Sequence, residues 1–435
     1  MTALAAATAA YDLVIVGAGA AGLMAAGAAA KAAPALRIAA LERNQTPGKK
    51  LSITGKGRCN ITNNAEKEQF MRNIPGNGKF LFSAFHTLPN TAIVAFFERI
   101  GVGCVLERGG RYFTRSGDAK QVTEALCRHA ASSGAKLLCG ARLEAIERAT
   151  DAAPAIGRDA DLFRLLLSDG RRITARAVIL ATGGISYPAT GSTGDGYRFA
   201  ESLGHTVVPP RPSLVPLETV EDWPRTLMGL TLKNVTLELF TPGGKRCFSK
   251  LGEMLFTHFG ISGPLVLSGS RHLLDCGFSG SAARIDLKPG LSDEKLRARI
   301  GRDFELYAKK RLKNAMSDLL PTRLIPVVIA CGGLDPEGRA DAVGKAGRAK
   351  LSEILKNLPL TIRAARPASE AIVTAGGVKT SEINPSTMES KRMPGLYFCG
   401  ELIDVDAYTG GFNLSIAFAT GMLAGKSAAA ALLRD

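Results

Sequence analysis

The chain has 435 residues, of which 46% are hydrophobic and 22% charged, and its formal net charge is +16. A chain of this length is too long for one ordinary hydrophobic core. It can form two or three domains, each large enough to fold without stabilising disulfides or metal ions. The Lys and Arg residues are spread thinly, without a block of five or six like charges, so the composition favours a solvated basic surface over a nucleic-acid site.

The spacing of the cysteines and the first apolar stretch of the chain indicate where in the cell the protein is located. Eight cysteines are scattered without a CxxC pair or a short-spaced Cys/His cluster, which predicts reduced thiols and no metal site. A disulfide-reductase mechanism needs a closely spaced redox pair and is disfavoured for the same reason. The apolar run 13–41 is interrupted by glycines, Lys31 and Pro34, so it is a poor membrane span. We therefore expect a cytoplasmic protein without a membrane partner.

A strand, a helix and a second strand open the predicted fold. Residues 11–16 are an apolar run that ends at glycine, residues 20–33 are an alanine-rich helical stretch closed by Pro34, and residues 36–42 form the next strand. A unit of about 30 residues with this order is typical of the start of a doubly wound parallel sheet. The sequence thus predicts an α/β fold.

The turn after the first strand carries a dinucleotide-binding motif. Its sequence is Gly17-Ala18-Gly19-Ala20-Ala21-Gly22, which matches GxGxxG. Gly17 permits the tight turn, Gly19 lets a pyrophosphate approach the backbone, and Gly22 allows the helix to pack against the strand. Glu42 lies 20 residues beyond Gly22, where a carboxylate accepts hydrogen bonds from a ribose diol and repels a 2′-phosphate. This first site therefore favours FAD or NAD over NADP.

The segment after this unit is less regular. Residues 44–64 are expected to form a Gly/Lys/Thr/Asn-rich loop, and residues 77–133 amphipathic helices that alternate with turns. Three strands follow at 142–148, 162–168 and 172–180, and Asp169-Gly170 predicts a hairpin between the last two. We interpret them as a small β-meander that returns to the main sheet.

The middle of the chain differs from both ends in residue composition and in its predicted secondary structure. A proline-dense crossing follows Gly204, strands are expected at 231–240 and 245–250, and a charged helical pattern covers 292–358. From Ala371 onward the sequence is again glycine-rich and apolar, as it is near the start. We predict a Rossmann-type domain from 1–205 and 359–435, interrupted by a β-rich part at 206–290, which would cap the substrate, and a helical part at 291–358.

Two later motifs favour FAD over NAD as the ligand. The strand 172–180 ends in small residues, Ala181-Thr182-Gly183-Gly184, that let a loop pass close to a dinucleotide. A second strand ends at Gly400-Glu401, where the acidic residue suits a ribityl hydroxyl, and Gly410-Gly411-Phe412-Asn413 begins the final helix. The amino terminus of that helix would stabilise negative charge at the N1/O2 edge of a reduced flavin. An enzyme that binds only NAD has no use for this distal half-site.

Taken together, these motifs resemble the BaiN-like, YhiN-type family of NAD(P)/FAD-dependent oxidoreductases. The collinear segments that carry the resemblance are Gly17 to Gly22, Gly48-Lys49-Lys50, Thr54 to Asn60, Gly183 to Pro188, Gly191 to Tyr197, Leu255 to Pro264, Thr374 to Val378 and Gly400 to Asn413. The resemblance implies a glutathione-reductase-like FAD domain split by an insert of β-barrel and helical parts, with bile-acid-related C=C reduction in some members. Two residues depart from the family pattern: Lys56 stands where glycine is usual and Phe412 where tyrosine is common.

Several residues in these segments admit two interpretations. Arg58 is expected to contact phosphate or the flavin carbonyl edge, and Cys59 is interpreted as a packing residue rather than a redox thiol. Asp195 would contact the cofactor or cap the following helix, with neither favoured. His258 is the one candidate catalytic residue, as a proton donor, although a hydrogen-bonded structural histidine is the favoured interpretation.

The motifs and the resemblance together predict one cofactor-binding set. Its members are Gly17, Ala18, Gly19, Ala20, Ala21, Gly22, Glu42, Arg43, Lys49, Lys50, Thr54, Gly55, Arg58, Cys59, Asn60, Leu143, Ala181, Thr182, Gly183, Gly194, Asp195, Gly377, Gly400, Glu401, Gly410, Gly411, Phe412, Asn413 and Leu414.

The predicted activity is an FAD-dependent oxidoreduction with non-covalently bound FAD, in which hydride passes between flavin N5 and an unidentified small molecule. Since no second GxGxxG is present, NAD(P)H would visit the substrate cleft transiently as the electron donor. Three alternatives use the same motifs: an FAD-dependent oxidase or monooxygenase, a flavin-dependent RNA-modifying enzyme, and a non-enzymatic flavin-binding scaffold. The sequence leaves the substrate, the donor and the oligomeric state open.

Overall fold

The computed structural model describes residues 9–148 and 163–434. Residue 162, the first residue of one predicted strand, lies outside these ranges, as do residues 1–8. The chain divides into two compact units, one made of residues 1–212 and 372–435 and the other of residues 213–371. The two ends of the sequence therefore fold together, as the glycine-rich, apolar composition that they share predicts.

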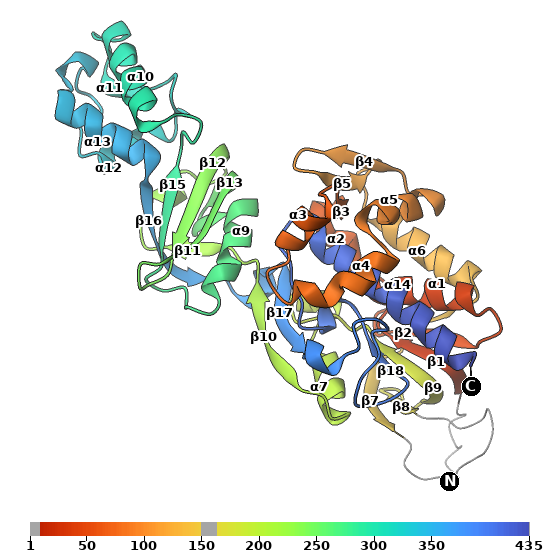
Figure 1. Ribbon diagram of the computed structural model, residues 1–435. Coiled ribbons are helices and arrows are strands. Elements are labelled where there is room, and N and C mark those ends of the chain that lie inside the picture. The colour runs from red at the N-terminus through yellow and green to blue at the C-terminus, as the bar shows by residue number, and fades with distance from the viewer. Residues whose placement is uncertain (1–8, 149–162, 435) are drawn as a thin grey trace. The chain divides into compact units, whose positions relative to one another are not determined.

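The first unit is built on a mixed sheet (Figure 1). Its strands stand in the order β6 (Lys136–Cys139), β2 (Ile38–Glu42), β1 (Ala9–Val16), β9 (Arg172–Leu180), β8 (Phe163–Leu167) and β7 (Leu143–Arg148), and β18 (Leu396–Phe398) also pairs with β9. The pairs from β6 to β9 and the β18–β9 pair are parallel, whereas β7, β8 and β9 form the predicted antiparallel meander. The last residues of β1 and β9 are completely buried or nearly so, which explains their continuous apolar runs.

Two small-residue helices, α1 (Ala20–Ala32) and α14 (Phe412–Leu432), pack against each other in this unit. A Cβ atom added at Gly421 or Gly425 would lie 2.3 Å from the carbonyl oxygen of Ala21 or Ala25, so the two backbones are in direct contact. By length and composition α14 would also pass as a membrane span, but 61% of that apolar stretch is buried inside the protein. Its apolar character follows from this packing.

The predicted loop at 44–64 is wrong. Residues there form helix α2 (Lys49–Gly57), which is kinked where Thr54, Gly55 and Lys56 leave helical geometry, and strand β3 (Asn60–Asn63). β3 joins β5 (Arg111–Thr114) and β4 (Cys104–Glu107) in a small sheet that the sequence did not predict. The helices in this part of the chain are α3 (Lys67–Arg72), η1 (Gly78–Leu81), α4 (Phe82–Thr87), α5 (Asn90–Arg99) and α6 (Lys120–Ser132), and α5 contacts β3 and β4.

The remaining elements of the first unit border its glycine-rich segments. They are η2 (Pro188–Thr190), α7 (Asp195–Ser202), β10 (Val207–Ser213), β17 (Val373–Val378), η6 (Thr380–Glu382) and η7 (Gly400–Leu402). β10 and β17 form a two-stranded sheet, so the proline-dense crossing is a strand rather than a linker. Its prolines are tolerated because such a strand has free edges where no N–H donor is needed.

The second unit contains a closed barrel. Its strands are β11 (Leu217–Thr219), β14 (Gly260–Ser262), β13 (Arg246–Thr257), β12 (Thr231–Phe240), β15 (Ala282–Asp286) and β16 (Leu358–Ala365), and β16 closes on β11. The short helices α8 (Trp223–Thr226), α9 (Pro264–Ser270), η3 (Arg271–Leu273) and η5 (Ala368–Glu370) accompany these strands. Between β15 and β16 the chain forms α10 (Asp293–Leu306), α11 (Leu312–Ala315), α12 (Ile325–Cys331), η4 (Ala340–Ala342) and α13 (Lys345–Lys356), which gather beyond one end of the barrel (Figure 1).

These pairings correct the predicted boundaries. The first boundary lies after residue 212 rather than after 205, because β10 pairs with β17 of the first unit. The second lies after residue 371 rather than after 358, because β16 completes the barrel. The barrel and the helices were expected as separate parts, yet one continuous set of buried apolar side chains runs through both.

Candidate functional site

The turn between β1 and α1 has the geometry that the glycine motif predicts. Gly17 has a φ of 103°, and a Cβ there would lie 2.6 Å from the carbonyl oxygen of Ala181. A Cβ on Gly22 would lie 1.8 Å from the carbonyl oxygen of Gly17, so both positions exclude any side chain. At Gly19, by contrast, a Cβ would meet nothing within 4 Å. Gly17 and Gly22 thus shape the turn, and Gly19 borders open space.

Glu42 lies at the end of β2, and its side chain is buried against this turn. One carboxylate oxygen accepts the Ala18 N–H at 3.2 Å, and the other accepts the backbone and side-chain N–H groups of Asn44 at 2.9 and 2.7 Å. A carboxylate offers about four acceptor positions, so one remains for a further donor such as a ribose hydroxyl. Asn44 was not predicted as a site residue, because its position two residues after Glu42 was its one signal in the sequence.

Arg43 and Asp195 connect this strand end to the start of α7. Arg43 Nη1 donates to Asp195 Oδ2 at 3.1 Å and to Thr193 Oγ1 at 2.5 Å, and Arg142 lies 3.7 Å from the same carboxylate. Among the residues that the structure describes, no side chain caps α7, so the interpretation of Asp195 as a cap is wrong. Asp195 holds two arginines instead, and its contact with a cofactor stays a prediction.

The second glycine segment is the kink of α2. Gly55, Lys56, Gly57 and Cys59 all have positive φ, so Lys56 occupies the left-handed region that glycine prefers. Non-glycine residues held in this region are strained by about 1 kcal/mol or more. The segment is therefore tightly constrained by its surroundings.

The side chains of this segment do not gather around one point. Arg58 forms two hydrogen bonds with Glu107, at 2.8 and 3.3 Å, and its guanidinium lies 4.1 Å from the centre of the Phe113 ring. Cys59 is completely buried, and burial raises the pKa of its thiol to about 12. A thiol that stays protonated at neutral pH is a poor redox nucleophile, in line with its interpretation as a packing residue.

An ion pair joins α2 to the Gly-Glu motif near the other end of the chain. Lys50 Nζ donates to Glu401 Oε2 and to Ser186 Oγ, both at 2.6 Å. Glu401 Oε1 in turn accepts the Ser186 hydroxyl at 2.9 Å and the Thr374 N–H at 2.8 Å. Ser186 and Thr374 belong to segments that carry the family resemblance, but sequence analysis gave them no role.

The amino terminus of α14 lies against β3. The Asn63 side chain donates to the Gly410 carbonyl at 2.9 Å, and a Cβ on Gly411 would lie 2.5 Å from the backbone of Thr62. Asn413 exchanges hydrogen bonds with the backbone of Ala407, at 2.9 and 2.7 Å, which fixes the preceding loop. The first turn of α14 is thereby held by residues from both ends of the sequence.

Other predicted residues shape the site through packing. Phe412 is buried edge-to-face against Phe70, with ring centres 4.8 Å apart, and Leu143 is a core residue of β7. A Cβ on Gly400 would lie 2.8 Å from that of Ala21, and one on Gly377 would lie 2.5 Å from the Leu402 carbonyl oxygen. Whether these residues touch a cofactor stays a prediction. The rest of the predicted set lies in the same unit, at Ala20, Lys49, Thr54, Asn60, Gly183, Gly194 and Leu414.

His258 belongs to the other unit, at the tip of the hairpin between β13 and β14. Its side chain is exposed, and its ring contacts Phe259 edge-on at 4.9 Å. In the described part of the chain it forms no hydrogen bond, so the interpretation as a hydrogen-bonded structural histidine is wrong. Its role as a proton donor stays a prediction.

The first unit offers a fit for an extended dinucleotide. Within residues 9–148 and 163–434, α1 and α14 both begin without a side-chain cap and without an acidic residue in the first turn, so their N–H groups are free for an anionic ligand. Open space adjoins Gly19, and the buried Thr182 hydroxyl has no partner among the described residues. The turn before α1 would hold the pyrophosphate and Glu42 the ribose, while the α14 terminus would face the electron-accepting ring. A flavin bound there supplies hydride transfer through N5.

Together, the Rossmann-type sheet, its glycine turn and the distal Gly-Glu and helix motifs define a flavin-binding oxidoreductase fold. The sequence matches the family described as HI0933-like protein Rossmann domain over residues 11–427, and the chain belongs to this family.

Curated relatives agree with this assignment. The chain is 32% identical to the 3-dehydro-bile acid delta(4,6)-reductase of Clostridium scindens, over 95% of this chain and 98% of that protein. It is 31% identical to the ribosomal RNA dihydrouridine synthase of Haemophilus influenzae, over 94% of this chain and 96% of that protein. These relatives confirm the resemblance seen in the motifs, and the protein is a flavin-dependent oxidoreductase.

A solved structure supports the fold alone. E. coli quinol fumarate reductase superimposes with a TM-score of 0.50 at 19% identity, covering 98% of this chain and 71% of that chain.

Proposed function

We propose that the protein reduces a C=C double bond conjugated to a carbonyl group, with electrons from NAD(P)H. The observation that carries this proposal is the chemistry common to two relatives of nearly full length. A 3-oxo-Δ4,6 steroid and a uracil ring both contain a C=C bond polarised by a carbonyl, and the two relatives are named for reducing them. A chain equally similar to both is best explained by the chemistry that they share.

The reaction balances with one hydride and one proton. The C=C π bond breaks, the carbon β to the carbonyl takes the hydride, and the α carbon takes a proton, while NAD(P)H is oxidised to NAD(P)⁺. Within the first unit, the uncapped amino terminus of α14 would stabilise negative charge on the reduced cofactor. The Lys50–Glu401 pair would hold the segments around it in place.

Within this class we favour a uracil base in RNA as the substrate. The formal net charge of +16 supports an anionic polymer over a single carboxylate-bearing steroid. The sequence alone favoured a solvated basic surface and a small molecule, and the Haemophilus influenzae relative changes that balance. A 3-oxo steroid with conjugated C=C bonds is the second candidate, favoured by the Clostridium scindens relative.

A single experiment separates these candidates. The purified protein is reduced anaerobically with NADPH or NADH, and its flavin absorbance is followed while uridine-containing RNA or a 3-oxo-4,6-diene steroid is added. We expect reoxidation by RNA, together with dihydrouridine in the nucleoside digest, identified by the mass of two added hydrogens. Reoxidation by the steroid alone would make the second candidate the function, and rapid reoxidation by oxygen alone would favour an oxidase.

We also propose a cytoplasmic location, supported by the eight cysteines, which are all free. Recovery of the protein from the periplasm of fractionated cells would contradict it.

A further inference from the structure

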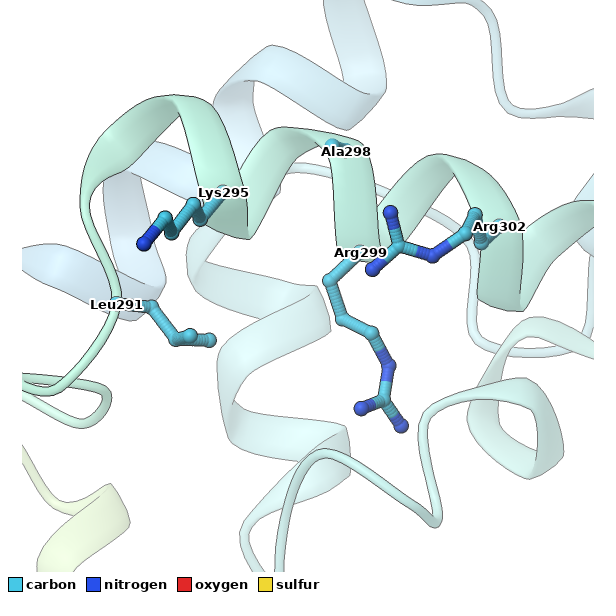
Figure 2. Close-up of a pocket in the computed structure, with 5 residues that line it drawn as sticks. All are labelled: Leu291, Lys295, Ala298, Arg299 and Arg302. Carbon is cyan, nitrogen blue, oxygen red and sulfur yellow. The ribbon is translucent and has the colours of Figure 1, made fainter.

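A hollow of about 240 Å³ lies beside α10 in the second unit (Figure 2). Lys295, Arg299 and Arg302 line it together with Leu291 and Ala298. Positions 295, 299 and 302 follow the i, i+4, i+7 spacing that places side chains on one face of a helix. The hollow is therefore lined by three cations and two apolar residues, and no acidic residue is among its lining residues.

Two of these cations have no acidic partner among the residues described. Lys295 and Arg302 are exposed and form no ion pair within that part of the chain. Arg299 donates from Nε to both oxygens of the buried Asp303, at 2.7 and 2.8 Å. This pair fixes the Arg299 guanidinium and leaves its two Nη groups without a partner there, so they remain available for an acceptor.

A fourth cation, Lys288, lies close enough to Arg299 to be affected by its charge, although it does not line the hollow. Burial and the charge of Arg299 together lower the pKa of Lys288, which precedes α10. The nearby carboxylate of Asp286 does not offset this charge, because it forms an ion pair with Lys356 at 2.6 Å. Among the described residues, Asp303 is the one acidic partner of these four cations, so an anion in the hollow would meet a net positive charge.

We propose that this hollow binds the phosphate backbone of RNA. From Lys295 to Arg302 the helix rises by about 10 Å, at roughly 1.5 Å per residue. That span exceeds one phosphate group, so side chains at its two ends can contact neighbouring phosphates of one strand. A polymer therefore uses all three cations at once, whereas a free phosphate reaches only some of them. The choice of RNA rests on the proposed function.

The test compares two arginines on one helix. Arg302→Gln removes a cation from the hollow, and Arg297→Gln, the control, removes another exposed cation of α10 that lies outside it. Binding of the full-length, flavin-loaded protein to a fluorescein-labelled RNA hairpin with a uridine loop is followed by fluorescence anisotropy at several salt concentrations. We expect Arg302→Gln to weaken binding about fivefold and to lower the salt slope by about one, and Arg297→Gln to leave both nearly unchanged.

Each outcome decides a different point. Equal affinities of the two variants, or no RNA binding by the parent protein, would overturn the phosphate site. Inorganic phosphate that competes beyond the effect of sodium chloride at equal ionic strength would also overturn it, in favour of a free phosphate ligand. If the variants differ as expected but no dihydrouridine forms, the proposed substrate fails while the binding site stands. If dihydrouridine forms but the variants bind RNA equally well, the proposed substrate stands and the phosphate site in this hollow fails.

Discussion

Lys50 donates a hydrogen bond to Glu401 at 2.6 Å, although 351 positions separate them in the sequence. Both side chains are about one-fifth exposed, and Ser186 and Thr374 bind the same carboxylate. Four segments of the chain thus meet at one ion pair. These contacts bring segments from both ends of the sequence together at one point.

Breaking this pair from either side leaves a partly buried charge without its partner. We expect Lys50→Met and Glu401→Gln each to lower the free energy of unfolding by about 1–3 kcal/mol. The double variant should lose at least about 1 kcal/mol less than the sum of the two, because the second change removes the charge stranded by the first. Equilibrium urea unfolding of the four proteins gives the coupling. Strictly additive losses would show that the two charges act independently.

Two glycines of the same turn should respond differently to alanine. Gly17→Ala places a Cβ 2.6 Å from the Ala181 carbonyl oxygen at a φ of 103°, so it should lower the free energy of unfolding by at least about 2 kcal/mol. Gly19→Ala meets nothing within 4 Å and should change stability by less than about 1 kcal/mol.

The methyl group of Gly19→Ala would stand in the space assigned to the pyrophosphate, and we expect the Kd for FAD to rise about tenfold. Urea unfolding without FAD and a flavin fluorescence titration measure the two effects. Unchanged FAD affinity in Gly19→Ala would remove the pyrophosphate from this turn.

The buried thiol of Cys59 predicts loss of stability in alkaline solution. Burial raises its pKa from 9.0 to about 12, so between these values the unfolded chain releases a proton that the folded chain retains. Below pH 9 this thiol does not lower the free energy of unfolding. Between pH 9 and pH 12 it lowers the free energy of unfolding by roughly 1.4 kcal/mol per pH unit. Cys399 shifts in the same direction for the same reason. Unfolding free energies measured across this range should therefore fall less steeply in Cys59→Ala, and equal slopes would show that the thiol titrates normally.

Local patterns predicted the first β-strand, helix and β-strand well, because an apolar run, a glycine turn and an alanine-rich helix lie next to each other in sequence. The small sheet of β3, β5 and β4 escaped prediction because each strand has only four residues and β3 pairs across about fifty positions. The kink of α2 was mistaken for a loop because Lys56 adopts a conformation that its side chain disfavours.

In the candidate site, the glycine motif could be recognised because close backbone approach restricts residue type, whereas ribose binding by Glu42 stays a prediction. Ser186 and Thr374 could not be recognised, since a hydroxyl or a backbone N–H gains its role only when Glu401 folds against it. Arg58 pairs with Glu107 in the fold, which its charge alone did not indicate, and its contact with phosphate or the flavin carbonyl edge stays a prediction.

The flavin content of the purified protein tests the central claim most directly, namely that both ends of the chain hold one cofactor. Denaturation should release one FAD per chain, free of covalent linkage, and the intact yellow protein should be bleached anaerobically by NADPH or NADH. A colourless protein that takes up no FAD in a titration would contradict the account.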